Sequence, residues 1–387
     1  MRAFPVPLPT VLAGFVAVLV GYASSAAIIW QAAEAAGADI QQIAGWLTML
    51  GIGMGISTLA LTLWYRAPIL TAWSTPGAAL LATSLHGSTL NEAVGVFIFA
   101  SALILICAAT GLFARLMRLI PHTLSAAMLA GILLRFGLDA FVSLQGHFLL
   151  CGSMLISWLL AKACAPRYAV VAALVAGLVI SLATGELKTE SVPLDVVMPV
   201  FTAPHFSLSS LLSVGLPFFL VTMTSQNAPG VATLKASGYH VPVSPLIVVT
   251  AVIALLLAPF GVFSICIAAI TAAICQGAQA HPDPAKRWLA AAAAGVFYLL
   301  AGIFGGSISA LLTALPLAFI HTLAGLALLS TLAGSLHQAL SHERERDAAI
   351  VTFLVTASGL TLAGTGSAFW GLIAGGICYG VFSARRA

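Results

Sequence analysis

Residues 71–83 read TAWSTPGAALLAT and place the pair Pro76-Gly77 inside an apolar run of a chain that is 61% hydrophobic. A segment in a lipid bilayer must satisfy its backbone groups internally, whereas proline lacks an N–H group and glycine loosens a helix. The residues between Gly77 and His86 can form a helix of only about 12 Å, less than half of the hydrocarbon core. If this run enters a membrane, the stretch predicts an extended segment at 71–77 and a half-helix that starts near the bilayer centre.

The composition places the chain in a membrane. Only 7% of its 387 residues are charged, against about a quarter in soluble domains, and the mean hydropathy is +1.09. A water-soluble fold is excluded, because so little charge cannot cover its surface. The N-terminal Arg2 and the apolar run at 11–30 also resemble a signal peptide, but the length of this run favours a first transmembrane helix.

The apolar runs between charges and turn residues predict an all-α polytopic membrane protein with fourteen transmembrane segments. The predicted segments are 10–31, 43–64, 70–85, 92–113, 118–138, 144–161, 167–184, 208–228, 243–258, 261–279, 286–306, 309–333, 347–363 and 366–383. Pro259 and Gly261 divide the uncharged stretch 241–280, which is twice the length of one segment.

The distribution of Lys and Arg tests this count, because basic residues collect on the cytoplasmic side of membrane proteins. With a cytoplasmic N-terminus, thirteen of the fifteen basic residues fall on the cytoplasmic side, and Arg135 and Lys188 are the exceptions. The acidic residues Glu34, Asp39 and Glu92 fall on the opposite side. We therefore expect a multi-pass protein with both termini in the cytoplasm.

Seven segments in each half would give the two halves opposite orientations, which is the arrangement of transporters built from inverted repeats. Segments five and twelve begin with similar sequences, IPHTLSAAMLAGILL (120–134) and LPLAFIHTLAGLALL (315–329). Segments three and ten each carry a Pro/Gly break. We therefore predict a first repeat at 1–195 and a second repeat at 196–387.

The second break, at Pro259 and Gly261, predicts a second half-helix that opens at residues 261–264. The free N–H groups and the positive dipole end of a helix N-terminus favour an anion. A packed proline kink is the alternative for either break alone. Two breaks at corresponding positions of two halves favour a binding site between them.

Three motifs together resemble the benzoate:proton symporter family of bacterial inner membranes, often called BenE. They are TAWSTPGAALLAT (71–83), TSQNAPGVATLKASGY (224–239) and AAITAAICQG (268–277). The resemblance covers nearly the whole chain and implies the fold of nucleobase:cation symporters and sulfate transporters. In that fold segments one to four and eight to eleven form a core domain, here about 10–113 and 208–306. The other segments form a gate domain, here about 118–184 and 309–383.

The resemblance also implies a substrate site between the half-helices of segments three and ten, flanked by segments one and eight. Carried over to this sequence, the site consists of Tyr22, Ser24, Ser25, Trp73, Thr75, Pro76, Gly77, Gln226, Asn227, Gly261, Val262, Phe263 and Ser264. An aromatic carboxylate suits such a site, because helix N-termini and amides can hold the carboxylate while Tyr22, Trp73 or Phe263 stacks on the ring. Interhelical hydrogen bonding is the alternative role of Gln226 and Asn227.

The chain departs from the nucleobase relatives, which carry acidic residues in segments eight and ten. It has Gln226-Asn227 in segment eight and no acid in segment ten, which fits an anionic substrate because like charges repel. Two candidates for proton coupling are left: His321 in segment twelve, and Asp139, one helical turn from Arg135 in segment five. An ion pair with Arg135 is the alternative role of Asp139, and a hydrogen bond to a neighbouring carbonyl is that of His321.

We therefore expect a secondary active transporter of the bacterial inner membrane that takes up an aromatic carboxylate, first of all benzoate, together with a proton. The alternatives are the same fold with another organic anion or a nucleobase-like solute, and an anion exchanger or channel. The sequence contains neither a GxxxxGK[ST] motif nor the polar constellation of a membrane-embedded enzyme. We thus expect no catalytic residue, cofactor, metal or nucleic acid, with the anion, the proton and the lipid bilayer as partners. Glycine spacings at 51–55, 302–306 and 371–375 fit packing within the bundle, and a homodimer stays open.

Overall fold

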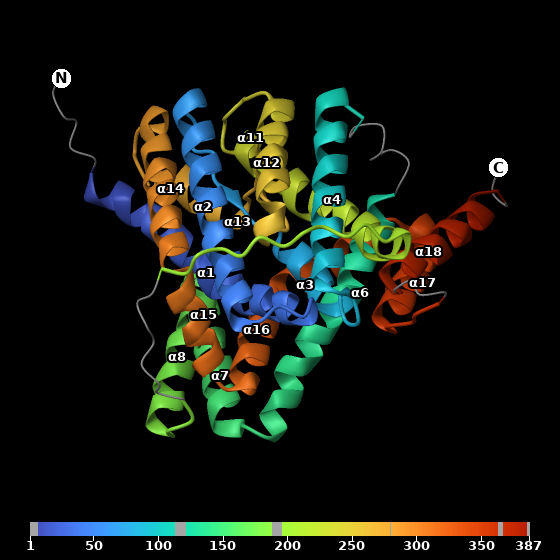
Figure 1. Cartoon of the computed structure of the whole chain (residues 1–387), viewed down its shortest axis with the longest axis horizontal. Coiled ribbons are helices and arrows are strands. Elements are labelled where there is room, and N and C mark those ends of the chain that lie inside the picture. Colours follow the sequence, from blue (N-terminus) through green and yellow to red (C-terminus); the bar gives the residue numbers. More distant parts are fainter. Residues whose placement is uncertain (1–6, 113–120, 188–195, 279, 363–366, 385–387) are drawn as a thin grey trace.

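The computed structural model describes residues 7–112, 121–187, 196–278, 280–362 and 367–384, and these are mostly helical (Figure 1). Within these ranges, eight helical stretches are long and apolar enough to cross a membrane: Leu8–Ala35, Ile40–Tyr65, Leu90–Thr110, His122–Gln145, Leu208–Lys235, Val243–Phe260, Pro284–Ile303 and Leu317–Ala339. The prediction of a helical membrane protein with several spans is therefore confirmed.

The helices and two short strands follow one another along the chain. Their bounds are α1 (Leu8–Ala35), α2 (Ile40–Tyr65), β1 (Thr71–Ala72), α3 (Thr75–Ser84), α4 (Leu90–Thr110), α6 (His122–Val142), α7 (Phe148–Cys164), α8 (Ala169–Ala183), α9 (Leu208–Ser210), α10 (Leu216–Thr222), α11 (Ala228–Ala236), α12 (Val243–Leu257), β2 (Cys266–Ile267), α13 (Ile270–Gln276), α14 (Trp288–Ile303), α15 (Gly305–Ala314), α16 (Leu317–Ala339), α17 (Arg346–Ala357) and α18 (Ser367–Ala384).

Local sequence determines where two of the long helices begin. The helices α2 and α4 each start with a capping box, in which the side chain of Asp39 or Thr89 accepts from a backbone N–H group three residues later. The side chains of Gln42 and Glu92 accept from the cap N–H groups in return. Both helices therefore begin within three residues of the starts predicted from the hydrophobic pattern.

Segment twelve differs from the prediction. The range 309–333 contains the end of α15 and most of α16, which are separate helices. Pro316 has no N–H group to donate, and Leu315 before it is extended with a ψ of 147°, so one helix cannot continue through this point. The structure thus adds a short helix, and the count of fourteen segments stays a prediction.

Segment eight continues beyond its predicted end at residue 228. The helices α9, α10 and α11 form one helical stretch that is interrupted by π-helical turns at Leu211–Gly215 and Met223–Asn227. A π-helical turn fits an extra residue into a helix and is frequent at functional sites. The second of these turns contains two of the predicted site residues, Gln226 and Asn227.

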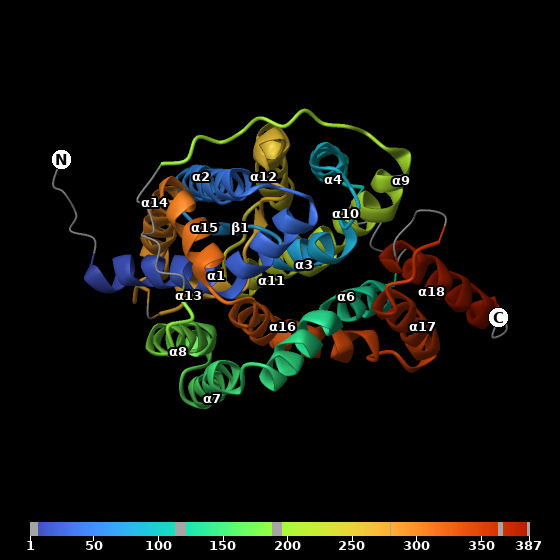
Figure 2. The same ribbon diagram turned by 60° about the horizontal axis from the view of Figure 1, so that its bottom comes forward.

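The helices pack into two groups that lie side by side in Figures 1 and 2. In the first group α2 packs on α14 and α15, α1 packs on α14, α3 and α13, and α12 packs on α4. In the second group α6 packs on α16 and α17, α17 packs on α18, and α7 packs on α8. Helix α1 meets both α8 and α16, so it lies at the boundary between the groups.

Residues 196–206 form an extended segment that runs across the outside of the first group (Figures 1 and 2). The N–H group of Thr202 donates to Pro259 O at 2.8 Å, and the N–H group of His205 donates to Asn91 O at 2.9 Å. These hydrogen bonds attach the segment to the end of α12 and the start of α4.

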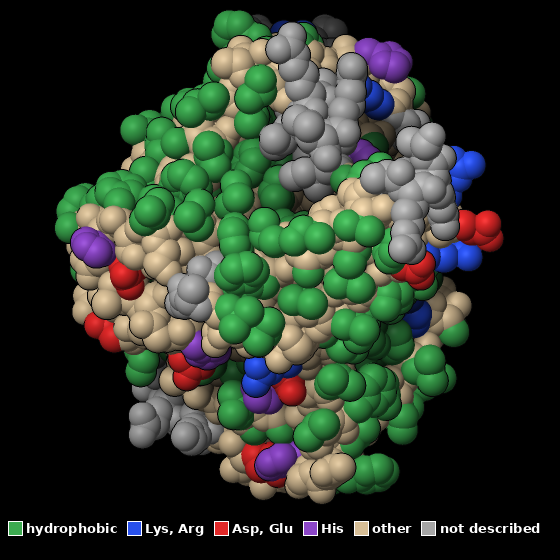
Figure 3. Space-filling view, turned by 90° about the vertical axis from the view of Figure 1, so that its right-hand side faces the viewer, with side chains coloured by type: hydrophobic (Ala, Val, Ile, Leu, Met, Phe, Trp, Pro, Cys, Tyr) green, Lys and Arg blue, Asp and Glu red, His purple; other side chains and the backbone are tan. Residues whose placement is uncertain are grey.

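The surface agrees with an environment of lipid. Figure 3 shows one face on which hydrophobic side chains cover much of the area, while Lys, Arg, Asp and Glu occur in small groups. On α7, the side chains of Phe148, Ile156 and Leu160 are more than half exposed, and Val179 of α8 is too. Side chains of this kind favour an apolar surrounding over water.

Gly261 provides a test of how the second break is built. Its φ of 91° lies in the left-handed region, and a Cβ placed there would overlap the indole ring of Trp46. We expect Gly261→Ala to lower the thermal unfolding temperature of the detergent-purified protein more than Gly37→Ala does. Gly37 has a φ of 79° but open space around it, so both variants share a left-handed strain of about 1–2 kcal/mol. An equal decrease of the unfolding temperature in both variants would show that the Trp46 ring can move aside without a cost in stability.

Candidate functional site

The first break joins β1 to α3 within three residues. Ser74 caps α3, since its Oγ accepts the Gly77 N–H at 3.0 Å, while its own N–H donates to Ser264 Oγ at 2.9 Å. Pro76 is the second residue of the helix, where a missing N–H group costs nothing. The helix start expected at Thr75 to Gly77 is therefore confirmed, although the extended stretch is shorter than predicted.

The second break is built differently from the prediction. Residues 261–264 do not start a helix, because Gly261 ends a 3-10 turn at Ala258–Phe260 and the strand β2 follows. The helix α13 begins only at Ile270. The predicted half-helix start at Gly261 to Ser264 was therefore wrong, since the backbone after Gly261 pairs with β1 instead of closing its own helical turn.

The two breaks satisfy each other's backbone groups. Strands β1 and β2 pair antiparallel, with Thr71 opposite Ile267 and Ala72 opposite Cys266. The hydroxyl of Thr71 also lies 2.8 Å from that of Thr58 on α2. These buried backbone groups thus have partners although neither chain segment is helical at this point.

The second π-helical turn supports β2. The Oδ1 atom of Asn227 accepts the Ile267 N–H at 3.0 Å, and the Asn227 side chain is fully buried. The Nε2 atom of Gln226 lies 3.5 Å from Ile267 O, which is the limit of a hydrogen bond. Asn227 is therefore held by the backbone, whereas Gln226 is only weakly held.

A cavity of about 500 Å³, here called the central cavity, lies where both breaks, α1, the second π-helical turn and the second helix group meet. Its polar lining side chains are those of Ser24, Ser25, Thr75, Lys162, Ser225, Gln226, Thr271, Tyr298, Ser330 and Thr331. The rest of the lining is mostly apolar and includes the ring of Trp73.

Six of the thirteen predicted site residues line the central cavity, namely Ser24, Ser25, Trp73, Thr75, Pro76 and Gln226. The indole Nε1 of Trp73 donates to Ser25 Oγ at 2.7 Å, and Ser25 Oγ donates to Gly21 O at 2.7 Å. This chain of hydrogen bonds holds the Trp73 ring in place at the border of the cavity.

The other seven predicted residues do not line the central cavity: Tyr22, Gly77, Asn227, Gly261, Val262, Phe263 and Ser264. The ring of Tyr22 packs edge-on against Trp73, with 4.8 Å between the centroids. Phe263 is buried in an aromatic cluster with Trp46 and Phe218. A Cβ on Gly77 would lie 2.6 Å from Phe218, so this glycine allows α3 to approach α10 and does not face the cavity.

Sequence reasoning missed the residues that the second helix group brings to the cavity. Lys162 of α7 donates from Nζ to Ser330 Oγ of α16 at 2.8 Å, and its ammonium lies 5.8 Å from the Trp158 ring centroid. The predicted segment 144–161 ends one residue before Lys162, whereas the helix α7 continues through Lys162 to Cys164. In the sequence, the adjacent hydroxyl residues Ser330 and Thr331 in an otherwise apolar segment were the indication that α16 contributes to a polar cavity.

The lining of the central cavity favours an anion. All of its lining residues belong to the described part of the chain, and among them Lys162 is charged while none is acidic. At the N-terminus of α3 the Gly77 N–H already has Ser74 Oγ as its acceptor and Pro76 has no N–H, so this helix start contributes mainly its positive dipole end. The helix α13 has only seven residues, so its dipole contributes less to the potential in the cavity than the predicted second half-helix would have done.

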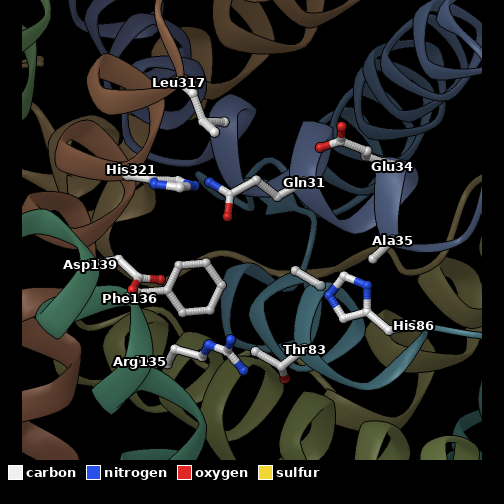
Figure 4. Close-up of a pocket in the computed structure, with 11 residues that line it drawn as sticks. Gln31, Glu34, Ala35, Thr83, His86, Arg135, Phe136, Asp139, Leu317 and His321 are labelled. Carbon is white, nitrogen blue, oxygen red and sulfur yellow. The ribbon is translucent and has the colours of Figure 1, made fainter. Parts of the chain in front are cut away.

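Both proton-coupling candidates lie in a second cavity of about 530 Å³, here called the charged cavity (Figure 4). Asp139 of α6 and His321 of α16 line it together with Glu34, His86 and Arg135. Among the residues that the structure describes, no ion pair joins Arg135 to Asp139. The ion pair considered as the alternative role of Asp139 is therefore absent here.

Comparison with known proteins gives a consistent result along the whole chain. Residues 4–381 match the family model described as Benzoate membrane transport protein. The chain is 67% identical over 383 residues to Inner membrane protein YdcO of Escherichia coli K12, which covers 99% of this chain and 98% of that one. It is 38% identical over 372 residues to the Benzoate membrane transport protein of Acinetobacter baylyi, which covers 96% of this chain and 94% of that one.

Two solved structures share the fold. The transmembrane domain of the cyanobacterial bicarbonate transporter BicA matches with a TM-score of 0.62 at 12% identity, over 96% of this chain and 98% of that one. The murine anion transporter Solute Carrier 26 family member A9, in an inward-facing state, matches with a TM-score of 0.59 at 13% identity. That match covers 99% of this chain and 69% of the other.

Gln226 and Asn227 should respond differently to truncation. In Asn227→Ala the buried Ile267 N–H loses its acceptor, which costs about 1–3 kcal/mol, so we expect a lower thermal unfolding temperature. Gln226→Ala should leave this temperature almost unchanged, because its contact is long. Thermal unfolding of both variants in one detergent is the measurement, and equal temperatures would contradict the structural role of Asn227.

Proposed function

The chain belongs to the family of benzoate membrane transport proteins, and we propose that it is a secondary active transporter that takes up benzoate or a close aromatic carboxylate together with a proton. The curated relative from Acinetobacter baylyi carries benzoate transport in its name. The observation that carries the proposal is the lining of the central cavity. There the ammonium of Lys162 donates to the hydroxyl of Ser330, the Gln226 amide lines the same cavity, and none of the lining residues is acidic.

The central cavity also suits the size and the ring of such a substrate. A volume of about 500 Å³ falls in the usual range of about 300–1,000 Å³ for ligand pockets. Trp73 presents a ring whose orientation is held by Ser25, and Ile270 and Leu328 add apolar walls. A benzoate ring can pack on these groups while its carboxylate reaches Gln226 or Lys162.

For the proton we propose His321 and Asp139. Both line the charged cavity, and the Asp139 carboxylate has no ion-pair partner among the described residues. Histidine is the side chain that ordinarily changes charge between about pH 5 and 8. Both residues can therefore bind a proton in one conformation of the transport cycle and release it in another.

The proposed mechanism needs the domains and repeats that the sequence predicts. A core at about 10–113 and 208–306 would correspond to the first helix group, and a gate at about 118–184 and 309–383 to the second. The helix α15 is the exception, because most of it falls in the predicted gate range although it packs on α2 of the first group. The antiparallel pairing of β1 and β2 supports two repeats of opposite orientation. Relative movement of core and gate would then expose the central cavity to each side in turn.

We also propose the bacterial inner membrane as the location, with both termini in the cytoplasm. The name of the Escherichia coli relative supports the location. With this orientation Lys162 lies on the cytoplasmic side of the central cavity, and the charged cavity faces the opposite side.

The alternative is the same fold with another organic anion or a nucleobase-like solute, or an exchanger or channel. The two structural relatives, both named for the transport of anions, support another anion on the basis of fold alone. The acid-free lining of the central cavity argues against a nucleobase-like solute, whose known carriers use acidic residues. A homodimer is compatible with the exposed apolar faces of α7 and α8.

Uptake of labelled benzoate into proteoliposomes tests the proposal. With an inward proton gradient we expect several-fold faster protein-dependent uptake than without it, and a protonophore should remove the difference. Protein-free liposomes are the control, because undissociated benzoic acid crosses lipid by itself. Equal rates with and without the gradient would contradict proton coupling. Absence of any protein-dependent uptake would contradict benzoate as the substrate, and protein-dependent uptake of labelled bicarbonate or uracil would then identify the alternative.

Lys162→Gln should raise the KM for benzoate by about tenfold or more, because a hydrogen bond to a charged group contributes about 1.5–3 kcal/mol. The matched control is Lys235→Gln, which removes the same charge from the last turn of α11, outside the central cavity. Its KM should stay unchanged. The measurement is the initial rate of uptake over a range of benzoate concentrations. An unchanged KM in Lys162→Gln would show that this residue does not bind the substrate.

A further inference from the structure

The charged cavity lies at the opposite end of the same helices that line the central cavity. Along α1, Ser24 lines the central cavity and Gln31 lines the charged cavity. Along α16, Leu328 lines the central cavity and His321 lines the charged cavity. The two members of each pair are seven positions apart in the sequence, which corresponds to about 10 Å along the helix.

A layer of packed apolar side chains separates the two cavities. Between them α1, α3 and α16 contribute Ile28, Ala79 and Ala324, which are at most 1% exposed. A ligand in one cavity therefore cannot reach the other without a rearrangement of these helices. The charged cavity is a site of its own in this conformation.

The charged cavity offers partners for both parts of an aromatic carboxylate. Among the described residues, the guanidinium of Arg135 has no ion-pair partner, and Gln31 Nε2 is a buried donor without an acceptor. Figure 4 shows Gln31 and His321 pointing toward one another across the cavity, with the Phe136 ring beside Arg135. A buried donor without an acceptor is unfavourable, and a carboxylate oxygen would satisfy it.

The charges of this cavity set a condition for the binding of an anion. Arg135 carries one positive charge and Glu34 and Asp139 carry two negative charges, so the sum is −1 while His86 and His321 are neutral. Protonation of both histidines changes the sum to +1. An anion is thus attracted more strongly after the cavity takes up protons, and by linkage a bound anion holds these protons more firmly.

One further acid lies nearby but belongs to a neighbouring, smaller cavity. Glu186 lines that cavity with Trp30, and its carboxylate lies 3.8 Å from His147 Nδ1. The sum of −1 counts the residues that line the charged cavity and so leaves Glu186 out.

We propose that the charged cavity is a second binding site for an aromatic carboxylate, which fills together with protons on His86 and His321. The carboxylate contacts Arg135 and Gln31, and the ring packs on Phe136. This inference rests on the proposed function, because it takes the same class of substrate. It adds that the anion and the protons combine before the anion reaches the central cavity.

Binding of labelled benzoate to the purified full-length protein tests the second site, by equilibrium dialysis at about pH 5.5 and about pH 7.5. At the lower pH we expect two equivalents per chain. Arg135→Gln and Gln31→Leu should each remove one equivalent, and Lys162→Gln combined with Gln226→Ala should remove the other.

Two further variants serve as controls for charge and fold. Arg135→Lys keeps the charge and should retain both equivalents. Arg344→Gln removes a positive charge from the exposed turn at Glu343–Glu345 and should also retain both. Thermal unfolding of every variant shows which of them are folded.

The histidines have a separate readout. In the wild-type protein the second equivalent should bind about tenfold more tightly at the lower pH, whereas the double variant His86→Gln/His321→Gln should show no such difference. A pH response that survives in the double variant would overturn the role of the histidines.

The outcomes separate this inference from the proposed function. A single equivalent that Arg135→Gln and Gln31→Leu leave in place, together with normal uptake in proteoliposomes, would overturn the second site and leave benzoate transport intact. No binding at either pH, together with no protein-dependent uptake, would overturn both.

Discussion

The pairing of two non-helical backbone segments in the interior of the protein is the constraint on which the rest of the structure depends. Lipid offers no hydrogen bonds, so a helix can be interrupted within a membrane only if each freed backbone group finds a partner in the protein. Here β1 and β2 are those partners for one another. Asn227 and Ser264 complete the arrangement by binding the backbone of Ile267 and Ser74.

This pairing also explains the position and the chemistry of the central cavity. Two segments that are not helical at the same depth of the protein leave space beside them. The N-terminal ends of α3 and α13 border that space together with α1. The side chain of Trp73 is oriented by the same local structure, through Ser25. The second helix group then closes the cavity with Lys162, Ser330 and Thr331, so the cavity lies between a rigid paired centre and a group that packs separately.

Much of the fold followed from the sequence because hydrophobic length and proline positions act locally. The starts of α2 and α4 and the helix start at Thr75 agree with simple rules of capping and of proline placement. The start of α13 could not be found in this way, because the backbone after Gly261 is held by a strand almost 200 residues earlier. For the same reason Asn227 was assigned to the substrate site, although its partner is the backbone of β2.

The candidate site was predictable where it depends on local motifs, and not where it depends on the approach of distant helices. The six predicted residues that line the central cavity come from the first break, α1 and segment eight. Lys162 was missed because its position at the end of a helix is equally typical of a residue at the membrane surface. The charged cavity was foreseen only as His321 and as Asp139 beside Arg135, since sequence spacing could not show that these residues come together with Glu34 and His86.

The long sequence separation of the two breaks has a consequence for biosynthesis. Ser74 and its partner Ser264 are 190 residues apart, so a ribosome that adds about 5–20 residues per second needs about 10–40 s between them. During that interval the first break has been inserted without the strand that satisfies it. The nascent chain must therefore hold these backbone groups in water, in the insertion machinery or against other helices. Final assembly of the centre is a late event that follows the synthesis of most of the chain.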